Sequence, residues 1–481
     1  MTLAATVARN TLAGFAGQAA VRLVQLGTSA VLARALHASG FGDLSYLIAV
    51  IGFFQFLGDL GVEKIVLREI AREPERAPSL VGAAIALRVL LSIGAAALAA
   101  LFFALFSPTA TLAHLGALAC LSLPLTVGSI YPAYYQAVLR VGMAAWITVV
   151  QGAITSGLLL LAALAPALVS SLEPIRLPLV VAAFALAPIP SLAASAWIAR
   201  RDLRPRIPGD RALWGPLLRQ AAPLAFNTIC ILVCLRADQV ILRSMKGAEA
   251  LGHYGAALRF FDAFTIVPSV LLLSVFPLMA RFDRVTPERI YETARWSYKA
   301  LSIFILPVAL AVTVLAGPIV RAIYGETYLP AARPLAILIW SLFFSFASMV
   351  TFDAVTAAGR QRVFLGLSVF TTAVNVALNL LLIPRYGATG AATAALLYSA
   401  SNLPILAALR ATRPLVAQLV AASWRPLLAV GLLALVPALG LPRAMFLALI
   451  FPAYALLLIA SGALGRDDLD LLRRVRGRAS F

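Results

Sequence analysis

Apolar runs of membrane-spanning length dominate this chain from near residue 10 to residue 464, and short polar or basic stretches separate them. A helix that crosses the hydrocarbon core of a bilayer needs about 20 apolar residues. The pattern therefore predicts an all-α integral membrane protein with about fourteen transmembrane helices. The predicted spans are 10–33, 41–61, 80–106, 111–138, 143–165, 177–199, 217–240, 252–280, 297–318, 331–353, 362–384, 387–409, 427–441 and 443–464.

Composition supports lipid exposure over a soluble core. The 481 residues are 62% hydrophobic and 12% charged, whereas soluble proteins carry about 25% charged residues. The formal net charge is +19, but the basic residues stand in short clusters between apolar runs. That placement is typical of membrane topology, so we expect no nucleic-acid partner.

The distribution of basic residues predicts the orientation. With a cytoplasmic N-terminus, the inside loops hold 27 Lys and Arg residues, the outside loops hold 8, and 4 lie within spans. This asymmetry follows the positive-inside rule and predicts that both termini are cytoplasmic. The first apolar segment lacks a signal-peptide cleavage pattern and is expected to remain as a span. The short outside loops disfavour a membrane-embedded glycan polymerase or glycosyltransferase.

Two halves of six spans each are predicted on either side of the basic linker 200–211. The predicted divisions are 1–205, 206–413 and 414–481, and the last of these holds two additional helices and a basic cytoplasmic tail. Gly42 and Gly252 stand in similar contexts 210 residues apart, and Gly142 and Gly359 do so 217 residues apart. These offsets indicate a duplication, with a substrate cavity expected where the two lobes meet.

Several motifs occur in a characteristic order. The first half holds 41–46 (FGDLSY), 58–61 (GDLG) and 67–72 (LREIAR); the second holds 323–328 (IYGETY), 357–360 (AAGR), 375–379 (NVALN) and 383–392 (IPRYGATGAA). Together they resemble polysaccharide-export flippases of the Wzx type, which serve O-antigen and exopolysaccharide assembly. The resemblance covers nearly the whole chain and places it in the multidrug/oligosaccharidyl-lipid/polysaccharide exporter superfamily.

The resemblance implies a V-shaped pair of six-helix lobes around a central cavity, alternating access, and no enzymatic activity. It implies that undecaprenyl-pyrophosphate-linked oligosaccharide crosses the bacterial cytoplasmic (inner) membrane. Expected partners are this substrate, membrane lipids, and the polysaccharide polymerase and chain-length proteins. A drug or organic-cation antiporter of the same fold and a lipid II flippase remain the alternatives.

Ionisable residues within spans are costly and are functional candidates by default. Arg22 lies near the middle of the first span, with Gln18 and Gln25 on the same helix face. Arg259 and Asp262 share a face of the eighth span. We expect all five to line a substrate cavity; the alternative is structural ion pairing. Cationic residues favour an anionic substrate such as pyrophosphate and argue against an organic cation.

Three further carboxylates lie near span ends. Asp59, Asp238 and Asp353 are candidates for gating or ion coupling, although solvation at helix ends explains them equally well. Arg88, close to the cytoplasmic end of its span, is expected to snorkel to the surface. No catalytic set, phosphate loop or metal-ligand spacing stands out, so we predict no catalytic residues, metal or cofactor. Asn375 and Asn379 are expected to bond between helices.

Overall fold

The computed structural model describes residues 3–138, 140–206, 211–280, 288–360, 363–436 and 443–463. Every regular element in these ranges is an α-helix or a short 3₁₀ helix. The prediction of an all-α protein is therefore confirmed. The helices group into two compact units, Thr6–Ala256 and Ala257–Phe481, each described by itself below. The divisions at 205/206 and 413/414 stay predictions.

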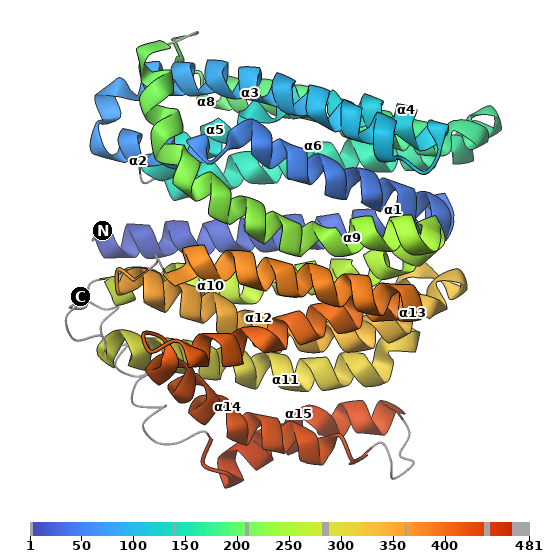
Figure 1. The fold of residues 1–481 in the computed structure, drawn as a ribbon, viewed down its shortest axis with the longest axis vertical. Helices are drawn as coiled ribbons and strands as arrows, with labels where there is room; N and C mark the ends of the chain where they lie inside the picture. Colours follow the sequence, from blue (N-terminus) through green and yellow to red (C-terminus); the bar gives the residue numbers. More distant parts are fainter. Residues whose placement is uncertain are drawn as a thin grey trace. The chain divides into compact units, whose positions relative to one another are not determined.

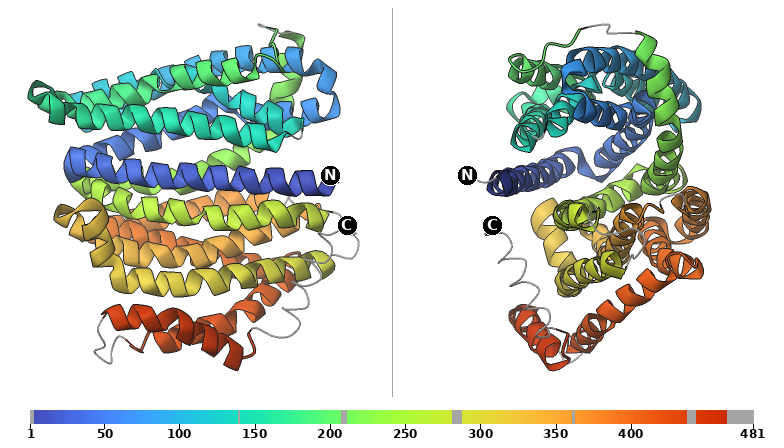
Figure 2. Two further views of the ribbon diagram at one scale, coloured as in Figure 1. Left: turned by 180° about the vertical axis from the view of Figure 1, so that it is seen from behind. Right: turned by 90° about the vertical axis from the view of Figure 1, so that its left-hand side faces the viewer.

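The first unit contains α1 to α8 and most of α9 (Figures 1 and 2). Short 3₁₀ helices at 74–76, 123–129, 170–175 and 211–213 connect them. The bounds are α1 Leu3–Asp59, α2 Val62–Arg72, α3 Ala77–Phe106, α4 Ala110–Cys120, α5 Ile130–Ala137, α6 Val141–Leu168, α7 Arg176–Leu186, α8 Pro188–Ala199 and α9 Trp214–Phe264.

The second unit contains the last turns of α9 and the helices that follow. In it, α11 packs against both α12 and α14, and α12 packs against α13. The bounds are α10 Ile266–Ala280, α11 Glu288–Tyr324, α12 Ala332–Ala357, α13 Val363–Ala408, α14 Arg413–Leu433 and α15 Arg443–Ala460, with a 3₁₀ helix at Glu326–Ala331.

The number of spans follows from helix length. In the described residues, nine helices are long and apolar enough to cross a membrane, and a tenth span forms if α4 is joined to the bent segment Leu123–Ala137. Three of the long helices, α1, α9 and α13, contain a non-helical residue midway. Of these, α1 and α13 each cover two predicted spans, and α9 covers one span and the first part of the next, which α10 completes. The last helix, α15, supplies a shorter apolar segment. The prediction of about fourteen transmembrane helices is consistent with this arrangement.

The breaks in α1 and α9 occur at equivalent positions. As one rod, the 57 residues of α1 would extend about 86 Å, far beyond a hydrocarbon core of about 30 Å. The chain instead turns at His37, with φ 56° and ψ 177°, and α9 turns at Gly247, with φ 86° and ψ −179°. These two residues are 210 positions apart, which matches the offset seen between Gly42 and Gly252.

Gly42 and Gly252 make a reciprocal close contact inside the first unit. A Cβ atom on Gly42 would lie 1.8 Å from the backbone oxygen of Ala248, and one on Gly252 would lie 1.9 Å from that of Ala38. Ala38 and Ala248 are themselves 210 residues apart. The backbone of α1 near Gly42 therefore packs against the equivalent backbone of α9 near Gly252. This reciprocal contact is expected of two duplicated segments that are related by a local two-fold axis.

The second offset in the sequence is wrong by three residues. The amide of Arg140 donates to the oxygen of Tyr135 at 2.8 Å, and the amide of Arg360 donates to that of Val355 at 3.0 Å. These identical turns end α5 and α12 and are 220 residues apart. Gly359, with φ 72°, thus corresponds to position 139 and not to Gly142. Glycine in both contexts suggested the wrong alignment.

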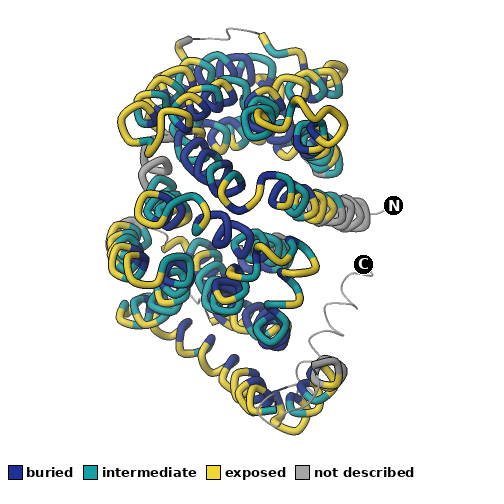
Figure 3. Tube along the Cα trace, turned by 90° about the vertical axis from the view of Figure 1, so that its right-hand side faces the viewer, coloured by how far each residue is buried: buried dark blue, intermediate teal, exposed yellow. Residues whose placement is uncertain are grey.

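Burial within each unit separates packing faces from outward faces (Figure 3). Large apolar side chains remain exposed along one side of α3, including Leu98, Leu101 and Leu105 at 54–66%. A soluble protein rarely exposes contiguous apolar patches of this kind. These faces are suited to contact with lipid chains, in agreement with the predicted membrane spans.

Candidate functional site: charged residues within the spans

Arg22 lies on an exposed face of α1. Its guanidinium donates a hydrogen bond to the side-chain oxygen of Gln25 at 3.4 Å, and both side chains are exposed. The two residues therefore share a face, as their spacing predicts; the Gln18 side chain lies outside the described residues. Arg22 forms no ion pair within the described part of the chain, so its charge is available to a ligand.

Arg259 and Asp262 form a loose pair in the second unit. The closest nitrogen and oxygen are 4.0 Å apart, and the two side chains are 31% and 40% exposed. An exposed pair at this distance contributes only about 0–1 kcal/mol to folding. Both groups remain able to contact a ligand, because their contact is long and both side chains are partly exposed.

Arg88 is the buried centre of an ionic cluster in the first unit, and its two carboxylate partners are partly exposed. The α3 side chain is 6% exposed; its Nε lies 2.9 Å from Asp59, and a second nitrogen lies 3.3 Å from Glu63. Its third nitrogen donates to the Ser129 hydroxyl at 3.0 Å, and that hydroxyl also bonds to Glu63. The expectation that Arg88 snorkels to the surface is wrong, because two carboxylates satisfy it in the interior.

Asp59 has a second structural task in the same cluster. Its carboxylate accepts hydrogen bonds from the amides of Gly61, at 3.1 Å, and Glu63, at 3.3 Å. It therefore caps the start of α2, where Leu60 and Gly61 adopt positive φ angles of 49° and 82°. The cationic partner of Asp59 is the buried Arg88 of α3, and a gating role for Asp59 stays a prediction.

Glu63 was not singled out from the sequence. It lies just outside the predicted span, in the basic segment 64–76, and its partner Arg88 is 25 residues away. Burial raises the pKa of Glu63, and the positive charge of Arg88 and the Ser129 hydrogen bond oppose that rise. Glu63 and Arg88 lie on different helices, so their spacing in the sequence does not predict that they meet. The packing of α2 against α3 brings them together.

A second set of polar contacts joins α1 to α9 within the first unit. Arg243, a residue placed in an outside loop from the sequence, is only 10% exposed and binds the Asp43 carboxylate at 2.8 Å. Asp238 is buried, accepts from its neighbour's amide, and receives a hydrogen bond from the Tyr254 hydroxyl at 2.5 Å. The Arg243–Asp43 pair therefore holds the two duplicated corners together beside Gly42 and Gly252, and the Asp238–Tyr254 bond joins the two parts of α9.

Asp353 differs from the other two candidate carboxylates. It lies in α12, is half-buried, and forms no ion pair within the described residues.

Asn375 and Asn379 are both buried in α13, where the Asn379 amide donates to the backbone and side-chain oxygens of Asn375 at 2.9 and 3.3 Å. The expected bonds between helices are thus replaced, for these donors, by bonds within one helix. Across the described residues, no group of three or more His, Cys, Asp or Glu side chains has the geometry of a metal site.

Solved structures of membrane transporters share this fold of long apolar helices. A lipid II flippase, MurJ, in an inward-closed conformation superimposes with a TM-score of 0.72 at 15% identity over 94% of this chain and 99% of that one. An inward-facing multidrug-resistance transporter of the MATE family superimposes with a TM-score of 0.58 at 16% identity, over 83% and 98%. These similarities show the fold.

The sequence profile described as "Polysaccharide biosynthesis protein" matches residues 7–283, more than half of the chain. This protein therefore belongs to the polysaccharide biosynthesis protein family. The MatE profile matches residues 223–381. A Shigella flexneri protein named "Putative O-antigen transporter" is 23% identical over 403 residues, covering 80% of this chain and 93% of that protein. The resemblance to polysaccharide flippases is confirmed, and the relatives named here are transporters and flippases.

Proposed function

We propose that this protein translocates undecaprenyl-pyrophosphate-linked oligosaccharide across the bacterial cytoplasmic membrane by alternating access, for the assembly of surface polysaccharide. Family membership supports the transport of a polysaccharide precursor. The similarity to a flippase fold supports a lipid-bearing substrate. The polymerase and chain-length proteins that would extend the glycan are the proposed protein partners, and membrane lipids surround the helices.

The observation that carries this proposal is the availability of Arg22. Arg88 and Arg243 are neutralised by carboxylates, whereas exposed Arg22 contacts only a neutral amide within the described residues. A charge at the centre of a span costs about 2.5–3.5 kcal/mol on insertion scales, so an unpaired arginine there is expected to face water or a bound anion. Pyrophosphate is such an anion, and its attraction to arginine strengthens where water is scarce.

Other polar and charged residues take supporting roles in the proposal. Gln18 and Gln25 would bind sugar or phosphate oxygens beside Arg22. Arg259 and Asp262 would provide a second polar surface. Of the three candidate coupling carboxylates, Asp353 forms no ion pair in the described chain, so we assign ion coupling to it first. Asp59 pairs with Arg88 of α3, and Asp238 joins the two parts of α9. These two residues would act as gates only if these contacts break during transport.

Variants of Arg22 in a strain that lacks the gene test this assignment. The wild-type gene should restore surface glycan, Arg22→Ala should fail to restore it, and Arg22→Lys should restore part, because a point charge replaces a bidentate fork. Arg34→Ala is the matched control, because Arg34 is an exposed arginine of the same helix close to the break at His37, and it should retain most activity. Arg22→Ala should accumulate in the membrane at normal levels, since its side chain is exposed. An abundant and fully active Arg22→Ala protein would contradict a role in binding.

A further inference from the structure

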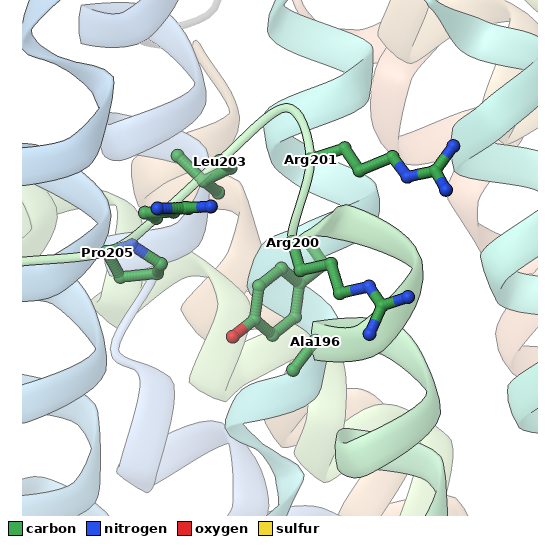
Figure 4. A pocket seen from close by; sticks show the side chains of 7 residues that line it. Ala196, Arg200, Arg201, Leu203 and Pro205 are labelled. Carbon is green, nitrogen blue, oxygen red and sulfur yellow. The ribbon is translucent and has the colours of Figure 1, made fainter.

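A basic cavity lies where the chain leaves the membrane after α8. The candidate span ends at Ala199, and the next residues turn back along the end of the first unit. Arg200, Arg201 and Arg204 line a cavity of about 590 Å³ together with Tyr131 and Pro205. Figure 4 shows the side chains of Arg200 and Arg201 extending to the same side of this turn. The cavity has the size of a small-ligand site.

The turn that carries these arginines is held by the helices beneath it. The amide of Arg206 donates to the oxygen of Pro78 at 3.0 Å, and Leu203 is 3% exposed. Gly82 permits this close approach, because a Cβ atom there would lie 2.0 Å from the backbone oxygen of Arg206. The backbone of this open surface cavity is therefore fixed in the first unit, and its exposed arginine side chains extend from it.

The arginines of this turn have no carboxylate to neutralise them. Asp202 is the only acidic residue in 200–206, and it pairs instead with Arg140 at 2.9 Å and accepts from the Tyr135 hydroxyl at 2.7 Å. These hydrogen bonds lower the pKa of Asp202. Arg200, Arg201 and Arg204 form no ion pair in the described residues, so the cavity presents uncompensated positive charge.

A tryptophan places this charge at the depth of lipid headgroups. The Arg200 guanidinium carbon lies 4.7 Å from the centre of the Trp197 ring, in a cation–π contact. Trp197 is 62% exposed near the end of the span. Exposed tryptophans near span ends occupy the interface between hydrocarbon and water. The arginines next to it therefore meet the phosphate layer of the membrane.

We propose that this cavity binds the phosphate-bearing headgroup of an anionic phospholipid. The charge selects an anion, and the position beside Trp197 favours an anion held in the bilayer over a soluble one. The site is distinct from the Arg22 face of α1 and does not depend on the proposed transport activity. A bound lipid here would anchor the turn that follows α8 to the membrane surface.

Lipid binding to the purified full-length protein tests the proposal. Native mass spectrometry in detergent would compare phosphatidylglycerol with phosphatidylcholine. Wild-type protein should prefer phosphatidylglycerol, and the R200A/R201A/R204A variant should lose about 100-fold in affinity, since each of the three basic residues near anionic lipid contributes about fivefold. The matched control is R68A/R72A/R76A, which removes three arginines already paired with Glu69 and Glu73 and should change affinity less than the cavity variant.

Two further measurements keep the outcome unambiguous. If the triple variant is poorly folded, the single variant Arg201→Ala should still fold, because its side chain is exposed, and it should lose about fivefold in affinity. Equal binding of both lipids, or equal loss in the cavity variant and the control, would overturn the proposal. Displacement of phosphatidylglycerol by inorganic phosphate at equal concentration would assign the cavity to a soluble anion. Stronger binding of undecaprenyl pyrophosphate, with the same arginine dependence, would assign it to the transported substrate.

Discussion

Arg88→Met is expected to destabilise the protein by at most about 3–5 kcal/mol, because it leaves the partly buried carboxylates of Asp59 and Glu63, whose side chains are 19% and 34% exposed, without their cation. Asp59 and Glu63 both contact Arg88 in the interior of the first unit. Their mutual repulsion would loosen the start of α2, which Asp59 also caps. A lower melting temperature of the purified protein and a smaller folded yield from membranes would report this loss.

A compensating variant separates lost charge balance from lost packing. The triple variant R88M/D59N/E63Q removes the stranded charges, and it should recover most of the stability because asparagine caps a helix about as well as aspartate does. Arg68→Met is the control: this arginine is exposed and paired with Glu69, and its loss should cost at most about 1 kcal/mol. Normal stability of Arg88→Met alone would show that the buried cluster does not hold the unit together.

Gly42→Ala is expected to prevent the close packing of α1 against α9. The added Cβ would lie 1.8 Å from a backbone oxygen, which cannot rotate away as a side chain can. Overpacking costs about 1–3 kcal/mol, and more where backbone must move. Gly252→Ala should have a similar effect, because it produces the reciprocal clash at 1.9 Å.

Gly94→Ala is the matched control for these variants. Gly94 lies inside α3, and nothing lies within 4 Å of a Cβ placed there. This change should leave stability unchanged or raise it by about 1 kcal/mol, since alanine favours the helix over glycine. Thermal unfolding in detergent would compare the three variants, and equal melting temperatures for Gly42→Ala and Gly94→Ala would contradict the observed packing.

The helical plan was predictable from hydrophobic pattern because lipid imposes it. In lipid, an α-helix forms all its backbone hydrogen bonds within one segment of chain. Each apolar run of sufficient length therefore predicts one membrane-spanning helix. The 210-residue repeat was also visible, because Gly42 and Gly252 are required by contact between backbones. The second offset was misjudged, since Gly142 and Gly359 look alike in sequence but occupy different positions in their turns.

Pairing of charges was less predictable, because it depends on contacts between helices. Arg88 and Glu63 belong to different helices and are 25 residues apart, so the helical spacing of about 3.6 residues per turn does not relate them. Arg243 appeared to lie in an outside loop, but it is buried against Asp43. The Arg22–Gln25 contact was predictable because it lies within one helix. Residues three or four apart are thus predictable from sequence, and partners brought together by packing are not.

The central claim, transport of a pyrophosphate-linked glycan lipid, is tested most directly in proteoliposomes. Purified protein would be reconstituted with a fluorescent undecaprenyl-pyrophosphate oligosaccharide, and a membrane-impermeant quencher would report the fraction of lipid in the outer leaflet. We predict that wild-type protein makes inner-leaflet lipid accessible and that Arg22→Ala, equally reconstituted, does not. Wild-type protein that leaves this lipid in place, while it moves lipid II or exchanges an organic cation for protons, would contradict the account.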